Sequence, residues 1–410
     1  MFYVYLYPEE KVQSITPGLN NGFGTRYVKR VGQLRWARLD RFHWNRHFQQ
    51  MLKIADSVKS TETRAVDALR SVLGQVPAIK LKSIARESRI DHAELDIVAE
   101  VSVGGRGHTL ACEVKENGQP RYVRAGLLQL RSYVAGLGRD VTPVLIAPFL
   151  SSAAQELCRE QGVGFLDLEG NVRLAFDTVF VECTVASKPA AERRELKSLF
   201  KPKSVQVLTI MLRDPARSWR VAELAEAADV SLGHVSNVRS ALLDHEWGQV
   251  SQQGLFLSAP DRLLDAWREA YEPPAGRRLG FYTTLHGGAF EEAARRVLSA
   301  GSDKGRAIFA SFSAAHWIAP FARTGTQLFY ADEHGVERLQ TALALSSPAK
   351  GENVVITVPE NEGAFRDALE PAPGAVCSGL VRTYLDLCAA GERGREAAEH
   401  LRRERMGWRT

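Results

Sequence analysis

The spacing of apolar residues predicts a helix followed by a hairpin in the first part of the chain. "MLKIADSVKSTETRAVDALRSVLG" (51–74) repeats apolar residues at helical spacing. "IDHAELDIVAEVSV" (90–103) alternates apolar and polar residues, as a half-buried strand does, and "GGRG" supplies a turn. "HTLACEVK" (108–115) then returns as the partner strand. A helix and a hairpin in this order indicate the beginning of a domain built around a sheet.

The pattern then alternates between helices and strands. "RAGLLQLRSYVAGL" (124–137) is amphipathic and predicts a helix, and the apolar run "VTPVLIAPFL" (141–150) predicts a buried strand. "SSAAQELCREQG" (151–162) has a serine for its N-cap and a glycine at its end, as helices do. Further short strands follow in residues 163–184. Together these elements predict an α/β domain over residues 51–190.

A second and a third domain are predicted beyond a charged segment. "ASKPAAERRELKSLFKPKS" (186–204) contains two prolines and is interpreted as a linker leading into a helix. In residues 198–270 an apolar helix precedes "RVAELAEAA", the turn "DVS", the helix "LGHVSNVRSALLDHEW" and the hairpin "GQVSQQGLFLS". This order predicts a winged helix-turn-helix, although a helical domain used for protein contacts is the alternative. Residues 276–405 mix helices and strands and predict a C-terminal α+β domain, so the fold class is α/β multidomain.

Composition narrows the class of protein. The 410 residues are 45% hydrophobic and 25% charged, as in globular proteins, and their number favours two or three domains. No run of eighteen apolar residues occurs, so no membrane helix or membrane partner is expected. The five cysteines form no CxxC pair or metal-ligand spacing, and we interpret them as buried or free thiols. We therefore expect a cytoplasmic location.

The excess of positive charge is confined to residues 1–50. This segment has eight Lys or Arg residues and three acidic ones, whereas residues 51–410 have 45 of each kind. "RWARLDRFHWNRHFQQ" interleaves basic and aromatic residues, which suits nucleic acid. Three interpretations remain for this basic leader. In the first, residues 1–50 are upstream sequence translated ahead of a true start at Met51. In the second they are a basic arm, and in the third they are a targeting segment.

The strand "HTLACEVK" has a carboxylate and an amine where a half-buried strand would usually have apolar residues. Glu113 and Lys115 are two residues apart and therefore share one face of the strand. Asp96 lies on the preceding strand of the predicted hairpin, which can bring it to the same place. Two carboxylates can bind Mg²⁺, which activates water and stabilises charge on phosphate, and a lysine can orient the nucleophile or neutralise that charge. Asp96 and Glu113 are thus the candidate metal ligands.

The helix that follows adds further candidates. Gln129 and Tyr133 are four residues apart and lie on one helical face, and Arg121 and Arg124 can hold phosphates near the turn.

Asp96, "EVK" and "QLRSY" resemble the PD-(D/E)XK nuclease superfamily, in particular the Gln-xxx-Tyr pattern of its RecB-like branch. The resemblance covers about residues 60–185 and implies that Asp96, Glu113, Lys115, Gln129 and Tyr133 are catalytic, with Mg²⁺ as cofactor. Leu95 precedes Asp96 in place of the proline of the family's "PD" pattern, a proline that is often absent. An acid on the first helix, either Glu62 or Asp67, could complete the site. The alternatives are a surface Glu–Lys pair or an inactive scaffold.

The predicted recognition helix supplies the second group of candidates. It offers five polar side chains to DNA: Ser231, His234, Ser236, Asn237 and Arg239. In a major groove, Asn can read adenine and Arg can read guanine. His234 is equally consistent with an exposed helix residue that has no role.

Longer stretches resemble the AbiEi-type antitoxins and regulators of type IV toxin–antitoxin systems. They are "EVKENGQPRYVRAGLLQLRSY", "PVLIAPFLSSAAQELCREQGVGFLDLEGNVRL", the winged helix and "GLVRTYLDLCAAGERGREAAEHL". The resemblance implies a regulator that binds double-stranded operator DNA and uses its C-terminal domain for a cognate toxin or self-association. The nuclease-like domain departs from the simplest members. The sequence therefore favours a DNA-binding regulator of toxin–antitoxin or defence type, with a Mg²⁺-dependent DNA endonuclease and an interaction protein as alternatives.

Overall fold

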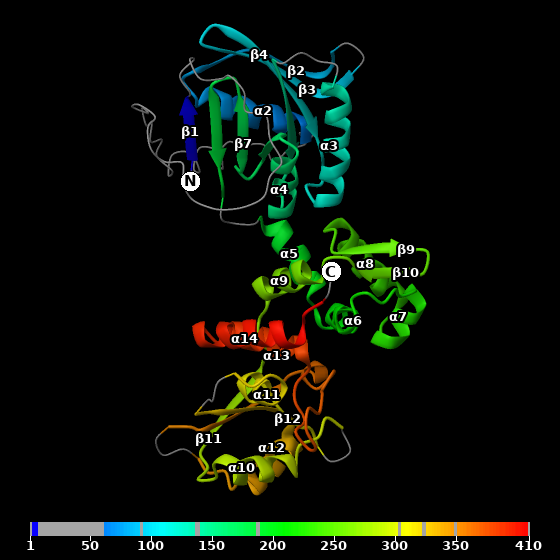
Figure 1. Ribbon diagram of the computed structural model, residues 1–410, viewed down its shortest axis with the longest axis vertical. Coiled ribbons are helices and arrows are strands. Elements are labelled where there is room, and N and C mark those ends of the chain that lie inside the picture. Colours follow the sequence, from blue (N-terminus) through cyan, green and yellow to red (C-terminus); the bar gives the residue numbers. More distant parts are fainter. Residues whose placement is uncertain are drawn as a thin grey trace. The chain divides into compact units, whose positions relative to one another are not determined.

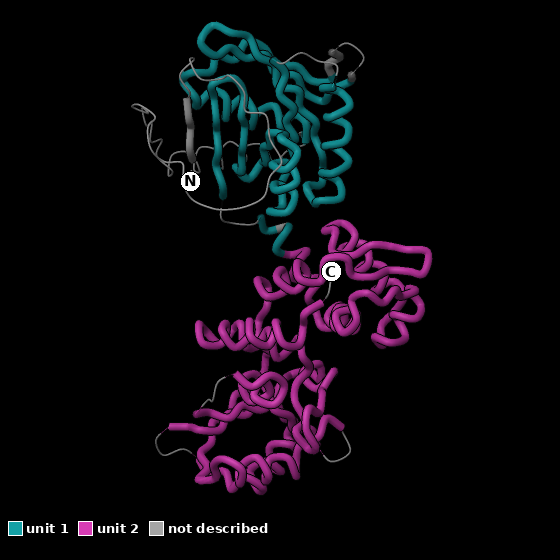
Figure 2. Tube along the Cα trace, in the orientation of Figure 1, with its two compact units in different colours: residues 1–193 teal, residues 194–410 magenta. Residues whose placement is uncertain are grey.

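The chain folds into two compact units, residues 1–193 and 194–410 (Figure 2). The computed structural model describes the backbone of residues 2–6 and then residues 61–90, 93–135, 140–185, 189–301, 305–321, 325–347 and 351–408. Most of the basic leader and the first ten residues of the helix predicted from Met51 lie outside the described residues. The proposed separation of residues 198–270 from residues 276–405 remains a prediction.

Unit 1 is a mixed α/β structure built on one eight-stranded sheet (Figure 1). Its elements are β1 (Phe2–Leu6), α2 (Thr61–Gly74), β2 (Ile79–Ile90), β3 (Ala93–Val103), β4 (Arg106–Val114), α3 (Pro120–Val134), β5 (Val141–Ala147), α4 (Ser152–Glu160), β6 (Gly164–Asp167), β7 (Val172–Phe176), β8 (Val179–Cys183) and the start of α5 (Ala190–Leu199). The strand order is β1-β8-β7-β6-β5-β4-β3-β2. The β4–β5 and β5–β6 pairs are parallel, and the other neighbouring pairs are antiparallel.

The sheet of unit 1 has a hydrophobic layer on each face. On one face, α2 buries Leu69 and Val72 against strand residues such as Ile97 and Leu110. On the other face, α3 and α4 pack over a second cluster that includes Leu145. Apolar residues therefore occupy both faces of the central strands, and a polar side chain there needs a partner or a function.

The structure differs from the sequence analysis at strand β2 of unit 1 and in the segment 186–204, which runs from unit 1 into unit 2. The strand β2 was not predicted, because it forms an edge of the sheet and carries charged residues that obscure alternation, as edge strands often do. The segment 186–204 was interpreted as a linker leading into a helix; its described part does lead into a helix, but it also contains helix α5 where the linker was expected. Pro189 directly precedes α5, and Pro202 is in the first turn of α6 (Pro202–Arg213), so both prolines mark helix starts.

Unit 2 begins with helices and a hairpin around an apolar core. After α6 come α7 (Val221–Ala228), α8 (Leu232–Asp244), β9 (Gly248–Ser251), β10 (Gly254–Leu257) and α9 (Pro260–Ala270). Leu208 of α6, Leu224 of α7 and Val238 of α8 are buried in one cluster. Trp219 and Leu255 exchange backbone hydrogen bonds of 2.7 and 2.9 Å, which adds a bridge beside the hairpin. Gly254 has a φ of +140°, and a Cβ there would lie 2.3 Å from the Trp219 carbonyl oxygen, so the bridge requires glycine.

The rest of unit 2 has a four-stranded sheet of order β11-β14-β13-β12. Its elements are β11 (Gly276–Phe281), α10 (Gly287–Arg295), β12 (Ala307–Phe309), α11 (Ser311–Ile318), β13 (Gln327–Ala331), α12 (Glu333–Ala342), β14 (Val354–Pro359), a 3₁₀ turn (Glu362–Ala364), α13 (Leu380–Ala389) and α14 (Glu392–Arg405). Arg402 of α14 donates to Asp261 and Asp265 of α9 at 2.6 and 2.7 Å. One apolar cluster continues from the helices at residues 196–267 into this part.

Cys112, Cys158, Cys183 and Cys377 are buried, Cys388 is half-buried, and all five are free thiols. Among the residues that the structure describes, no helix has the length and apolar character needed to cross a bilayer.

Candidate active site and nucleic-acid interface

The hairpin of β3 and β4 brings the two predicted carboxylates together. Its register pairs Ile97 with Cys112, so Asp96 and Glu113 are the next residues along the two strands. The Oδ2 atom of Asp96 accepts a hydrogen bond of 2.7 Å from the backbone N–H of Val114. This bond fixes Asp96 at the carboxyl end of β4.

Lys115 joins this pair to α3. Its Nζ donates to Oε1 of Glu113 at 2.6 Å and to Oε1 of Gln129 at 2.7 Å. The amide of Gln129 in turn donates to the Tyr133 hydroxyl at 3.4 Å, a long bond. Four of the five residues predicted to be catalytic are therefore linked by hydrogen bonds, with the lysine ammonium between a strand carboxylate and a helix amide, and Asp96 is held beside them by the Val114 backbone.

The electrostatic environment of Glu113 is unusual for a carboxylate. Glu113 is only 4% exposed. Burial raises its pKa and the nearby Asp96 carboxylate raises it further, whereas the hydrogen bond and charge of Lys115 lower it, with a raised pKa as the net result. A buried carboxylate beside a second carboxylate is expected to gain from a bound cation.

The donor set fits a hard divalent cation. Oδ1 of Asp96 and Oε2 of Glu113 have no hydrogen-bond partner among the described residues. Mg²⁺ commonly takes one or two protein carboxylates and fills its other positions with water and phosphate. Within the described ranges no group of three or more His, Cys, Asp or Glu residues has metal-binding geometry. A site here would therefore rest on the two carboxylates.

The two acids proposed from the first helix are on an element that packs in a different hydrophobic cluster from α3. Glu62 and Asp67 are on α2, whose buried residues pack on one face of the sheet. The Asp96 group lies by α3, whose buried residues pack on the other face. Asp67 forms an ion pair with Arg70 on its own helix at 3.4 Å.

Gly126 is a residue of this site that sequence reasoning missed. A Cβ at Gly126 would lie 2.9 Å from Cε of Lys115 and 2.9 Å from Cδ1 of Leu145. The absence of a side chain at this position of α3 therefore makes room for the lysine to reach Gln129. A glycine in the middle of an amphipathic helix, where it costs about 1 kcal/mol relative to alanine, was the available signal.

Gly118 shapes the segment that joins β4 to α3. A Cβ there would lie 1.7 Å from the carbonyl oxygen of Phe149, so the two chain segments approach as closely as glycine permits. The next residue, Gln119, is buried and donates to Glu192 at 2.9 and 3.1 Å. Arg121 and Arg124 follow on the first turns of α3, where both are exposed and both have partners.

The predicted recognition helix α8 divides its polar residues between two roles. Ser231 is its N-cap and accepts from the His234 N–H at 3.3 Å, and the His234 ring bonds to the Ser204 hydroxyl of α6 at 3.1 Å. These two residues stabilise the helix and its packing, so His234 is not the simple outward-facing residue that was expected. Ser236 and Asn237 are exposed and Arg239 is half-buried.

A second set of polar side chains comes from the hairpin. Gln249, Gln252 and Gln253 are exposed on or between β9 and β10. They were not predicted individually, although "GQVSQQG" was part of the predicted hairpin.

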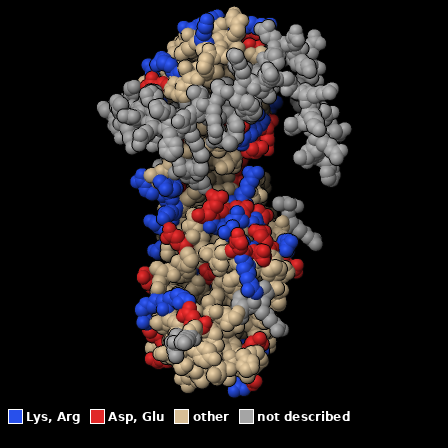
Figure 3. Space-filling model, turned by 90° about the vertical axis from the view of Figure 1, so that its left-hand side faces the viewer, with Lys and Arg blue, Asp and Glu red and all other residues tan. Residues whose placement is uncertain are grey.

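On the face drawn in Figure 3, basic and acidic side chains are interspersed over the coloured surface. This mixture agrees with the balanced charge of residues 51–410 and indicates that DNA contact would depend on local groups.

Comparisons with known proteins give weak structural similarity. No family model matches the chain, and no curated protein matches it. A repair endonuclease from Pyrococcus abyssi is 21% identical with a TM-score of 0.21, over 28% of this chain and 50% of that one. A complex of EndoMS with dsDNA is 21% identical with a TM-score of 0.20, over 28% and 48% of the two chains. The matches thus span about half of each known chain, and TM-scores this low do not establish a common fold.

Proposed function

We propose that the protein is a metal-dependent DNA endonuclease whose catalytic group is Asp96, Glu113, Lys115, Gln129 and Tyr133. The observation that carries this proposal is the position of the Lys115 ammonium, 2.6 Å from a buried carboxylate that neighbours a second one. A surface Glu–Lys pair would be exposed and would need neither the second carboxylate nor the glutamine. The proposal places this chain in the PD-(D/E)XK superfamily, with Mg²⁺ as the expected cofactor.

Each residue has a distinct expected role in phosphodiester hydrolysis. Asp96 and Glu113 would hold the cation, which supplies a water of lowered pKa and stabilises charge on phosphate oxygens. Lys115 is positioned to stabilise the negative charge that develops on the phosphate, since its ammonium lies 2.6 Å from the Glu113 carboxylate. Gln129 orients the ammonium by accepting one of its three hydrogens, and Tyr133 contacts the glutamine amide. Arg121 and Arg124 are proposed to contact the DNA backbone.

Delivery to double-stranded DNA is proposed for the α6–α8 helices and the β9–β10 hairpin, as a winged helix-turn-helix. The order of elements and the exposed Ser236 and Asn237 on α8 support this proposal. Arg239 could contact DNA after a change of rotamer, because it is half-buried. A role for residues 276–405 in binding a toxin or a second copy, and a cytoplasmic location, remain predictions.

A cleavage assay tests the proposal. Purified protein is incubated with supercoiled and with linear DNA in Mg²⁺ or Mn²⁺, with EDTA as the metal-free control. We expect nicking or linearisation that requires the metal and disappears in Glu113→Ala. No cleavage of either substrate, or cleavage that persists equally in Glu113→Ala, would contradict the proposal.

A second function is favoured by the helices of unit 2 and by the resemblance to AbiEi-type regulators. In this alternative the protein binds operator DNA and unit 1 is an inactive scaffold. It predicts sequence-specific binding that Asn237→Ala weakens, together with no cleavage in any metal. Footprinting on the DNA upstream of its own coding sequence, combined with the cleavage assay, distinguishes the two functions.

A further inference from the structure

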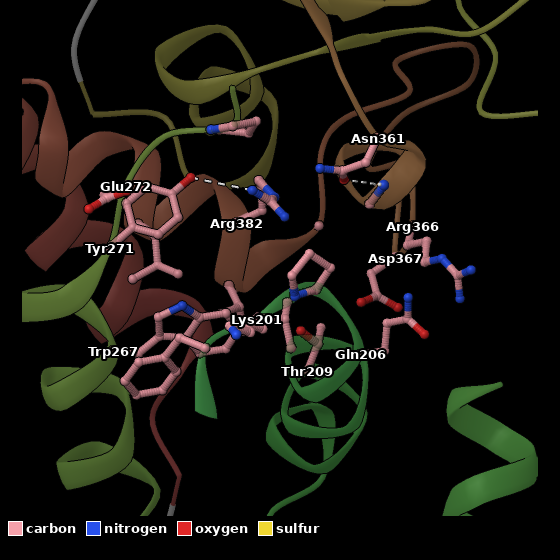
Figure 4. Close-up of a pocket in the computed structure, with 18 of the residues that line it drawn as sticks. Lys201, Gln206, Thr209, Trp267, Tyr271, Glu272, Asn361, Arg366, Asp367 and Arg382 are labelled. Carbon is pink, nitrogen blue, oxygen red and sulfur yellow. Dashed lines mark hydrogen bonds between the residues drawn. The ribbon is translucent and has the colours of Figure 1, made fainter. Parts of the chain in front are cut away.

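A cavity of about 680 Å³ lies within unit 2, lined by α6, the end of α7, the segment after α9, the 3₁₀ turn and α13 (Figure 4). Its volume is within the range of pockets that bind small organic ligands, about 300–1,000 Å³. None of the residues proposed for catalysis or for DNA contact lines it. The cavity is therefore a separate feature from the nuclease-type group of unit 1.

The charged residues of the cavity wall are mainly basic. Five basic side chains line it, against two acidic ones, Glu272 and Asp367. The basic residues are Lys197, Lys201, Arg213, Arg366 and Arg382. Glu272 is paired with Lys197 at 3.0 Å, and Asp367 is paired with Arg213. Arg366 is paired with Asp229 at 3.7 Å, which leaves Lys201 and Arg382 as the lining cations outside these ion pairs. Their charge favours an anionic ligand.

Arg382 is the most firmly held of these cations. Its Nη1 donates to the Tyr271 hydroxyl at 3.4 Å, and Tyr271 and Tyr330 both donate to the buried carboxylate of Asp386. The Arg382 guanidinium is therefore held in position by the Tyr271 hydroxyl and by the negative charge of Asp386. A planar guanidinium held in this way can bind a carboxylate or phosphate through two parallel hydrogen bonds.

The cavity also has an apolar side and an unsatisfied polar atom. Trp267 lines it and stacks on Phe200 with ring centroids 5.5 Å apart, and Val205 and Ile210 of α6 add aliphatic surface. The buried side-chain oxygen of Gln206 has no hydrogen-bond partner among the described residues. In Figure 4, Tyr271, Trp267 and Glu272 lie on one side, Asn361, Arg366 and Asp367 on the other, and Arg382 and Lys201 between them.

We propose that this cavity binds a small organic anion with an aromatic or apolar body, a carboxylate or phosphate group and a hydrogen-bond donor. The apolar body would pack by Trp267, the anionic group would bind Arg382 and Lys201, and the donor would satisfy Gln206. Burial of apolar area and charge-assisted hydrogen bonds would together supply the affinity.

Isothermal titration calorimetry on the full chain tests this proposal without DNA or metal. The probes are salicylate, phenyl phosphate, the neutral salicylamide and inorganic phosphate. Salicylate and phenyl phosphate distinguish a carboxylate ligand from a phosphate ligand. We expect at least one of these two to bind, and salicylamide and inorganic phosphate to bind about tenfold more weakly or not at all, since salicylamide lacks the anionic group and inorganic phosphate lacks the aromatic body.

Matched variants locate the binding. Lys201→Glu reverses a charge that lines the cavity, whereas Lys203→Glu makes the same change two residues away on the exposed surface of α6. We expect Lys201→Glu to weaken binding about tenfold and Lys203→Glu to leave it within about twofold. Thr209→Trp, which fills the space from α6, should abolish binding. Failure of both aromatic anions to bind, equal binding of salicylamide, or equal effects of the two lysine variants would overturn the proposal.

Discussion

The candidate catalytic residues of unit 1 are Asp96, Glu113, Lys115, Gln129 and Tyr133, called here the Glu113 group. They and the exposed face of α8 in unit 2 use polar side chains in different ways. Around Glu113, side chains that range from the buried carboxylate to the exposed Gln129 bond to one another, and these bonds fix the positions of their polar atoms. On α8, Ser236 and Asn237 are exposed and have no hydrogen-bond partner among the described residues. Preorganised charge suits the stabilisation of a transition state, whereas exposed polar side chains suit recognition of a partner that supplies the missing bonds.

This difference leads to opposite expectations for substitutions. A change in the Glu113 group should alter chemistry and leave DNA affinity largely intact. A change on the exposed face of α8 should alter affinity and leave the rate from the bound state intact.

The largest effect is expected for Asp96→Asn. Asparagine can still accept the Val114 N–H, so the hairpin should fold normally, but the site loses one of two negative charges. We expect cleavage to fall at least about a hundredfold and Mg²⁺ affinity to fall with it. Cleavage kinetics and Mg²⁺ titration measure both. Asp177→Asn, an exposed acid on the turn between β7 and β8, is the control and should have no effect.

A smaller loss is expected for Gly126→Ala. The new methyl group would push Lys115 and Leu145 from their positions, and a displacement of about 1 Å at a catalytic group can cost up to about a hundredfold in rate. The expected signature is a lower cleavage rate with unchanged DNA affinity. Gly288→Ala on α10, where a Cβ meets nothing within 4 Å, is the matched control. Equal rates in Gly126→Ala and wild type would show that the lysine position is not critical.

On α8 the expected change is in affinity. Asn237→Ala removes an exposed amide and should weaken binding to the preferred DNA sequence by about 1–3 kcal/mol, without changing thermal stability. Fluorescence anisotropy with a labelled duplex measures the affinity, and single-turnover cleavage at saturating protein measures the rate. A slower rate at unchanged affinity would reverse the roles assigned to the two regions.

The smallest effect concerns stability and pH. The pKa of Glu113 is raised in the folded protein, so its ionised form opposes folding at neutral pH, and this cost disappears as pH falls below the ordinary glutamate value. Glu113→Gln should therefore increase the free energy of unfolding at pH 7, with a difference that shrinks toward pH 4. Urea unfolding at both pH values measures it. Glu156→Gln, at an exposed ion pair, should change stability by less than about 0.5 kcal/mol. A destabilised Glu113→Gln would contradict this reading of the site.

The accuracy of sequence reasoning followed the strength of the local pattern. The Asp96, Glu113, Lys115, Gln129 and Tyr133 group could be assembled because two-residue strand periodicity and four-residue helix spacing fix which side chains share a face. The sequence also predicted that Ser151 is an N-cap, and its side chain accepts a hydrogen bond of 3.3 Å from the Ala154 N–H.

Other features depend on contacts between residues far apart in the chain. The edge strand β2 lacks a clear apolar alternation, and the bond between Ser204 and His234 joins residues 30 positions apart. The cavity beside Arg382 is formed by several segments between residues 197 and 385, and no local sequence motif predicts it. Packing that joins distant segments determines such features, and a single sequence does not reveal it.

The most direct test of the nuclease proposal is the single-turnover rate of duplex DNA cleavage in Mg²⁺ for Lys115→Ala beside Lys80→Ala. Lys80 is an exposed lysine of β2 in the same sheet, so the pair separates loss of a particular ammonium from loss of any lysine. We predict that Lys115→Ala lowers the rate at least about a hundredfold while binding DNA normally, and that Lys80→Ala cleaves like wild type. Wild-type protein that binds DNA without cleaving it, or Lys115→Ala that cleaves at the wild-type rate, would contradict the proposal.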